Sequence, residues 1–312
     1  LPFWDILNHY YPDNRHPPLF YLVLSFFLDW STEEWVARLP ALIFGNLSLV
    51  GLCFLGKECK NEWVGVVATV LMASHPLFLE QCGQVSDVSL FLSLLIASNI
   101  ILLRYISKPK TMTLGLLVLL ETGMVWSYYM GIVVLFVHVI LLVRNASWAE
   151  YRWGIVGLTI LNLPVFNSFS KLIIQDLQFR DSVTQNPEHL WGNENRLSLV
   201  VDYVNLFSFG GKWEFTALLL FSGLIWFKKN LNPKVYIHIQ LLLLAGLVLS
   251  FGAPVVRLKS YYALFALPSL CLLVALGATS WGQWVSFPIL TVLGIAINTS
   301  SSSHQQIMST AL

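Results

Sequence analysis

Ten apolar stretches constrain the fold of this chain more than any other feature of its sequence. A helix needs about 17–25 predominantly apolar residues to cross a bilayer, and several of these stretches lie near the lower end of that range. Charged residues make up only 11% of the 312 residues, against about 25% in soluble domains. The sequence therefore predicts an all-α polytopic membrane protein with about ten transmembrane helices, at residues 36–57, 62–79, 86–106, 111–126, 128–144, 152–171, 213–228, 235–252, 259–279 and 283–298.

Basic residues are concentrated in four short loops between these stretches, at 57–62, 104–110, 144–152 and 228–234. By the positive-inside rule these loops are cytoplasmic. The loops on the opposite side hold nearly all the unusual polar residues, so we expect chemistry at the non-cytoplasmic end of the bundle, on the periplasmic or extracellular face of an inner (plasma) membrane. The basic residues in the cytoplasmic loops are Lys57, Lys60, Arg104, Lys108, Lys110, Arg144, Arg152, Lys228, Lys229 and Lys234.

The organisation that we expect is one transmembrane domain at 1–298, with external loops at 1–35 and 172–212 and a polar tail at 299–312. The chain begins with Leu1 and shows no charged region followed by a cleavage site, so we expect no signal peptide and a missing N-terminal segment. Of the four cysteines only Cys82 falls in an external loop, which argues against an internal disulfide. The net charge of +1 indicates no nucleic-acid partner.

A proline turn precedes the first of the ten stretches. The apolar run at 17–28 is too short to span a bilayer, so we interpret residues 17–30 as a re-entrant or juxtamembrane helix. Pro17 and Pro18 suit the first turn of a helix because they have no N–H to donate. Arg15 and His16 stand beside the N-terminus of that helix, where an anion, and a phosphate above all, is favoured.

Five motifs follow one another at 16–19, 34–42, 83–91, 127–131 and 259–268. In this order they resemble the GT-C class of membrane glycosyltransferases, which includes protein O-mannosyltransferases and lipid A aminoarabinose transferases. Residues 16–19 are similar to the His/Lys-Pro-Pro-Leu turn of that class. Two departures stand out: Tyr128 occupies a position where histidine is common, and the acidic catalytic pair that precedes the proline turn in the class is absent, which we attribute to truncation of the sequence.

The resemblance implies an inverting transfer of sugar from a polyprenyl-phosphate donor to a lipid, glycan or protein acceptor. Such a reaction needs a carboxylate as general base and positive groups that stabilise the leaving phosphate. It needs no cofactor, although some relatives use a divalent cation, and we expect no metal ligands. The catalytic candidates are Asp13, Asp5 and Asp87, the donor-phosphate candidates are Arg15, His16, Arg257 and Lys259, and the acceptor or sugar candidates are Gln84, Tyr128, Tyr129 and Trp191.

Most of these residues also have a purely structural interpretation. Asp87 suits the N-cap of its own helix, the cations suit interfacial anchors, and the aromatic residues suit an interfacial belt. Glu121 lies inside an apolar stretch, so either it has a partner on another helix or it is protonated. For His138 and His238 we favour hydrogen-bonded core residues over ligands.

Two other functions fit the composition. A transporter or flippase of lipid-linked sugars would share the site for an anionic headgroup without needing a base, although the two related halves common in transporters are not seen. A non-catalytic membrane scaffold would use the proline turn for structure alone.

Overall fold

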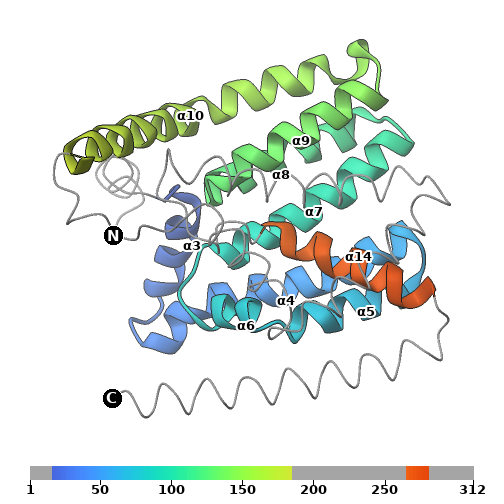
Figure 1. The fold of residues 1–312 in the computed structure, drawn as a ribbon, viewed down its shortest axis with the longest axis horizontal. Coiled ribbons are helices and arrows are strands. Elements are labelled where there is room, and N and C mark those ends of the chain that lie inside the picture. Colours follow the sequence, from blue (N-terminus) through green and yellow to red (C-terminus); the bar gives the residue numbers. More distant parts are fainter. Residues whose placement is uncertain (1–15, 185–264, 281–312) are drawn as a thin grey trace.

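The computed structural model describes residues 16–184 and 265–280, and within these residues every regular element is a helix (Figure 1). This agrees with the predicted helical membrane protein. The helices are α3 (Leu19–Leu28), α4 (Glu34–Cys59), α5 (Glu62–Ala73), α6 (Pro76–Gly83), α7 (Val88–Ser107), α8 (Thr111–Ser127), α9 (Met130–Asn145), α10 (Trp148–Thr184) and α14 (Leu267–Ser280).

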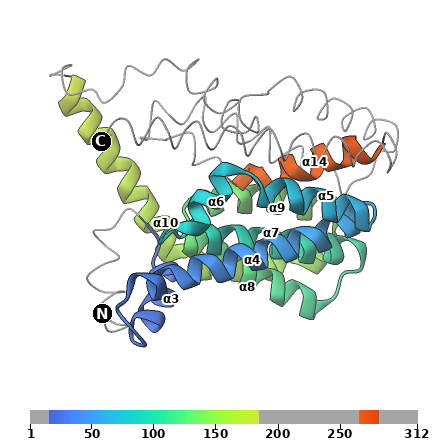
Figure 2. The ribbon, with the colours of Figure 1, turned by 90° about the horizontal axis from the view of Figure 1, so that it is seen from below.

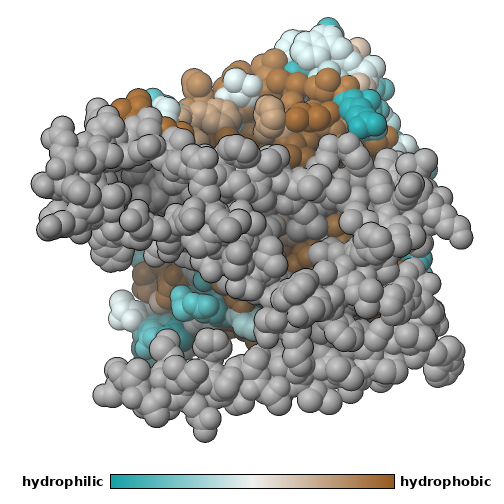
Figure 3. Space-filling view, viewed as in Figure 1, coloured by the Kyte–Doolittle hydropathy of each residue, from teal (hydrophilic) through white to brown (hydrophobic). Residues whose placement is uncertain are grey.

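The longer helices lie alongside one another in a bundle, and the short helix α3 lies at one end of it (Figures 1 and 2). Helix α4 contacts α5 and α7, α7 contacts α8, and α14 contacts α5. Large apolar side chains remain exposed on the outer surface, such as Leu47 and Phe54 on α4, at 52% and 54% exposure. Figure 3 shows a similar apolar surface over α9 and α10. Exposed apolar faces of this kind suit contact with lipid.

Within residues 16–184 and 265–280, three helices are long and apolar enough to cross a membrane: Glu34–Cys59, Val88–Ser107 and Trp148–Ile174. Helices α5 and α6 together pass the same test but are bent by 66°, where the sequence predicted one stretch at 62–79. Pro76 begins α6 and explains the break, because proline has no N–H and its ring clashes with a preceding helical turn. The stretches at 213–228, 235–252 and 283–298 lie outside the described residues, so the count of ten stays a prediction.

The proline turn leads into a helix as predicted. Pro17 and Pro18 are buried, and Pro18 is the N-cap of α3, which is ten residues long. Phe20 is only 2% exposed, and α3 packs against α4 and α8. This burial fixes the first turn of α3 against the end of the bundle.

The loops alternate between the two ends of the bundle. The loops at 57–62, 104–110 and 144–152 meet at one end, where Arg104 forms an ion pair with Glu58 at 3.2 Å and the Tyr105 hydroxyl donates to the Glu150 carbonyl at 3.0 Å. Helix α3, the α6–α7 turn and the α8–α9 turn lie at the other end (Figure 1). The segment predicted as an external loop at 172–212 begins as helix, since α10 continues to Thr184.

Candidate functional site

The proline turn and the start of α7 are joined by one polar contact. His16 and Asp87 are 71 residues apart in sequence, yet His16 Nδ1 lies 2.9 Å from Asp87 Oδ2. The His16 side chain is 38% exposed and the Asp87 side chain only 10%. The structure thus brings together two residues that the sequence had assigned to different parts of the site, one to the donor phosphate and one to catalysis.

Asp87 occupies the N-cap position of α7, but its side chain makes no cap hydrogen bond. Ser86 caps the helix instead, because its hydroxyl oxygen accepts a hydrogen bond from the Val88 N–H at 3.3 Å. The same hydroxyl donates to Gln81 Oε1 at 2.9 Å, which ties the turn to α6. Asp87 therefore stands at a helix N-terminus, where a negative charge is favoured, with its carboxylate directed to His16.

The α6–α7 turn is also anchored to α4. Arg38 Nη1 donates to the Gly83 carbonyl at 3.1 Å, and Arg38 Nη2 bonds the Glu34 carboxylate one helical turn earlier. Sequence reasoning noted Glu34 and Arg38 only as part of a motif and gave them no function. The available signal was a charged pair at i, i+4 at the start of an otherwise apolar helix.

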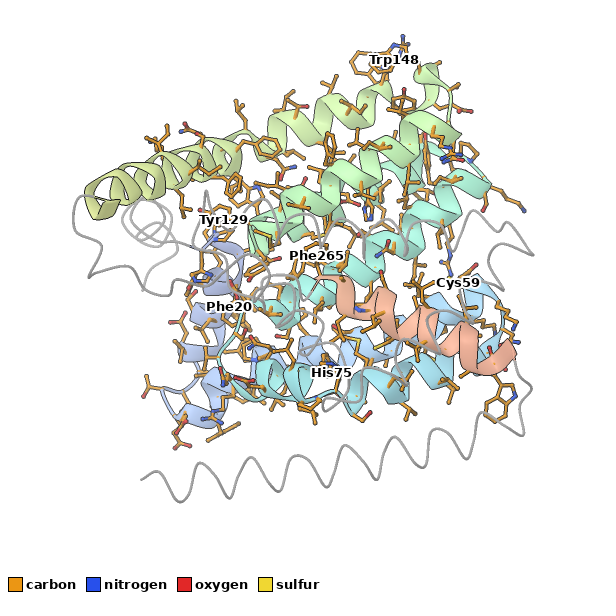
Figure 4. The ribbon with its side chains drawn as sticks, in the orientation of Figure 1. Phe20, Cys59, His75, Tyr129, Trp148 and Phe265 are labelled. Carbon is orange, nitrogen blue, oxygen red and sulfur yellow. The ribbon has the colours of Figure 1, made fainter. Side chains whose placement is uncertain are left out.

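The acceptor-side candidates differ in exposure. Gln84 is exposed in the α6–α7 turn. Tyr128 and Tyr129 are buried, at 4% and 8% exposure. The Tyr128 ring packs on Phe91 of α7 at 5.2 Å between centroids, and Figure 4 shows Tyr129 at the same end of the bundle as Phe20. Their contact with sugar or acceptor stays a prediction.

Glu121 of α8 has a partner on a neighbouring helix, one of the two alternatives left open by the sequence. Its Oε1 lies 2.5 Å from His138 Nδ1 of α9, and each residue is 1% exposed. Sequence reasoning placed both residues inside apolar helices but did not pair them.

Several predicted site residues lie outside the described part of the chain: Asp5, Asp13, Arg15, Trp191, Arg257 and Lys259. His238, for which the sequence predicted a core position, lies outside it as well. Among the described residues there is no group of three His, Cys, Asp or Glu side chains placed to hold a metal ion. The roles of the undescribed residues, and the expectation that no cofactor is required, stay predictions.

Residues 15–169 match the sequence model of the family described as dolichyl-phosphate-mannose-protein mannosyltransferase. The chain belongs to the GT-C class of membrane glycosyltransferases. The matching segment contains both His16 and Asp87, together with helices α3 to α9. It therefore includes the whole of the contact between the proline turn and α7.

The fold of this GT-C chain is shared with a solved structure, ArnT from Cupriavidus metallidurans in the apo state. The TM-score is 0.58 at 13% sequence identity, and the match covers 90% of this chain and 55% of ArnT. The chain thus spans about half the length of ArnT, and at this identity the likeness concerns the fold alone. No curated protein matches the sequence.

Proposed function

We propose that this GT-C chain transfers a sugar from a polyprenyl-phosphate donor to an acceptor by an inverting displacement. The observation that carries the proposal is the 2.9 Å contact between His16 and Asp87 at the end of the bundle where α3 begins. It joins a cationic or hydrogen-bonding group, a carboxylate and a helix N-terminus within the segment that matches the family. A lipid phosphate and a reacting hydroxyl need these groups.

The donor lipid would lie along the apolar helices, with its phosphate at the start of α3. The first backbone N–H groups of a helix lack partners within the helix and favour an anion. The bond from Nδ1 to Asp87 fixes the orientation of the His16 ring, so that Nε2 lies on the opposite side from the carboxylate. We assign the donor phosphate to His16, with Arg15, Arg257 and Lys259 as the further cations that stabilise it on leaving.

The general base would be a carboxylate close to that phosphate. Asp87 has two roles in the proposal: Oδ2 orients His16, and Oδ1 takes the proton of the acceptor. Asp13 and Asp5 are the other candidates for the base, because they precede the proline turn. Gln84, Tyr128, Tyr129 and Trp191 would face the acceptor or the sugar, which leaves the chemistry to side chains without a required cofactor.

The charge distribution supports a site on the non-cytoplasmic face. The described basic loops meet at the end of the bundle opposite to His16 and Asp87, and positively charged loops stay in the cytoplasm. We therefore propose an inner (plasma) membrane enzyme whose site opens to the periplasmic or extracellular side, where the acceptor is a lipid, a glycan or a protein.

The test is sugar release from a radiolabelled polyprenyl-phosphate sugar by the full chain in liposomes. Asp87→Asn removes the charge while it keeps the size of the side chain, and we expect a loss of about 10²–10⁴ in turnover, which is the usual contribution of a general base. Asp29→Asn is the matched control, since Asp29 is exposed at the end of α3, and we expect a change of less than about threefold. Wild-type turnover by Asp87→Asn, or transport of intact donor without sugar release, would contradict the proposal.

A further inference from the structure

Glu121 and His138 form a buried polar pair between α8 and α9, in a region that the proposed chemistry does not use. Glu121 Oε1 and His138 Nδ1 are 2.5 Å apart. The second oxygen of Glu121 and the Nε2 of His138 have no hydrogen-bond partner among the described residues. Within that part of the chain, each side chain thus depends on the other for its hydrogen bond.

The apolar surroundings make the contact between these two side chains important for the packing of α8 on α9. A buried polar group without a hydrogen-bond partner is costly, so each side chain holds the other in place. Whichever atom carries the proton, the hydrogen bond between Nδ1 and Oε1 links the two helices.

The pair lies about two helical turns from the turn that joins α8 to α9. Glu121 is about 9 Å from the end of α8 and His138 about 12 Å from the start of α9, at 1.5 Å per residue. The backbones touch at the hairpin, since a Cβ at Gly131 would fall 2.8 Å from the Met124 carbonyl oxygen. The hairpin thus closes tightly at its tip, and the buried pair joins its two arms further along the helices.

A continuous set of contacts connects this hairpin to the candidate site. Tyr128, at its tip, packs on Phe91 of α7 at 5.2 Å between ring centroids. The Phe91 N–H donates to the Asp87 carbonyl at 3.1 Å, so Phe91 lies one turn from Asp87 on the same helix. A shift of α9 along α8 would move the Tyr128 ring against the helix that presents Asp87.

We propose that Glu121 and His138 are positioning residues that set the register of the α8–α9 hairpin and thereby place Tyr128 beside the Asp87 end of α7. The effect on turnover rests on the proposed function, whereas the effect on the hairpin does not. Three backbone hydrogen bonds allow the structure of the hairpin to be followed by amide exchange. The N–H groups of Tyr128, Gly131 and Ile132 donate to the carbonyl groups of Met124, Tyr128 and Tyr129, at 3.2, 2.8 and 3.0 Å respectively.

The first measurement is hydrogen exchange of residues 124–132 in the full chain, with melting temperature as the check on folding. Glu121→Leu/His138→Leu removes both polar groups, which often preserves stability. We expect a folded variant whose exchange is at least about tenfold faster in this segment, equivalent to about 1.4 kcal/mol of local stability. Glu121→Gln keeps a donor toward Nδ1, and we expect exchange within about threefold of wild type.

The second measurement is turnover with the polyprenyl-phosphate sugar. A displaced hairpin lowers kcat by about tenfold while the donor KM stays within about twofold, because misplacement affects the reaction more than donor binding. Glu121→Gln retains most of kcat. Asn99→Leu is the matched control, since Asn99 is buried on α7 but donates to the Leu95 carbonyl of its own helix at 2.9 Å, and we expect its exchange at 124–132 to equal wild type.

Wild-type exchange in the double variant would overturn the proposal, because the hairpin would then hold its register without the pair. Loss of kcat in Glu121→Gln with wild-type exchange would also overturn it, since charge and not position would then matter. If the double variant does not fold, Glu121→Met replaces it with the same expected result and the same refuting one. Faster exchange in a protein that consumes no donor would support the positioning role and contradict the proposed function.

Discussion

Helices α4 and α5 cross at two glycines, Gly56 and Gly65, and a single methyl group added at Gly65 tests this close approach. A Cβ built on Gly65 would lie 2.2 Å from the carbonyl oxygen of Cys53 on α4. The contacting atoms belong to the backbone, so a change of side-chain rotamer cannot relieve the clash. Ordinary contacts of this kind are about 3.3 Å, so Gly65→Ala has to separate the two helices locally by about 1 Å.

The cost follows from that separation. A gap of 0.5–1 Å forfeits about a quarter to a half of each van der Waals contact, and overpacking of a well-packed interior costs about 1–3 kcal/mol. We expect Gly65→Ala to lower the free energy of unfolding by about 2–3 kcal/mol. At about 2–4 °C per kcal/mol this lowers the melting temperature by about 5–10 °C.

The assay is thermal unfolding of the purified chain in detergent, with Gly115→Ala as the matched control. Gly115 is exposed within α8, and a Cβ there meets no atom within 4 Å. The same substitution should therefore stabilise the protein by about 0.4–1 kcal/mol, because alanine favours the helix more than glycine does. The reasoning is refuted if Gly65→Ala melts at or above the temperature of Gly115→Ala.

Two further predictions concern the polar contacts. Arg38→Ala removes the donor to the Gly83 carbonyl, so we expect turnover to fall by about three- to tenfold as the α6–α7 turn loosens. Glu34→Gln alters only an exposed ion pair and should change turnover by less than about twofold. Equal effects of the two variants on sugar release would argue against an anchoring role for Arg38. His138→Leu leaves the Glu121 carboxyl group buried without its partner and should lower the free energy of unfolding by about 3–5 kcal/mol. Adding Glu121→Leu should restore most of that loss. A double variant less stable than His138→Leu in the same melting assay would contradict this prediction.

The helices of the described region were largely predictable from the sequence. Apolar stretches of sufficient length and the charged or proline-containing segments between them predicted α4, α7, α8 and α9 to within a few residues. Pro17 and Pro18 predicted the start of α3. These features are local, since a helix depends on residues three or four positions away.

The break between α5 and α6 was missed although a local signal was present. Pro76 falls inside the stretch at 62–79, and the residue before a proline disfavours helical backbone. The hydropathy of the stretch is continuous, so hydropathy alone does not indicate the break. At this position the backbone preference imposed by Pro76 outweighs the continuous hydropathy of the stretch.

The contacts of the candidate site were not predictable from the sequence. His16 and Asp87 are far apart in the chain, and their meeting depends on where α3 packs against the bundle. The Arg38 bond to Gly83 and the pairing of Glu121 with His138 likewise depend on which helices are neighbours. Residue chemistry marked His16, Asp87 and Glu121 as unusual, but only the packing of helices supplied their partners.

The most direct test of the central claim is a double-mutant cycle on the binding of polyprenyl phosphate in nanodiscs, with His16→Ala, Asp87→Asn and the double variant. If the two residues form one phosphate-binding unit, each single change weakens binding by about tenfold, and the double variant binds hardly more weakly than either single variant. This result corresponds to a coupling free energy between His16 and Asp87 of about 1–1.5 kcal/mol. Single effects that multiply to about a hundredfold in the double variant, or single variants that bind as wild type does, would contradict it.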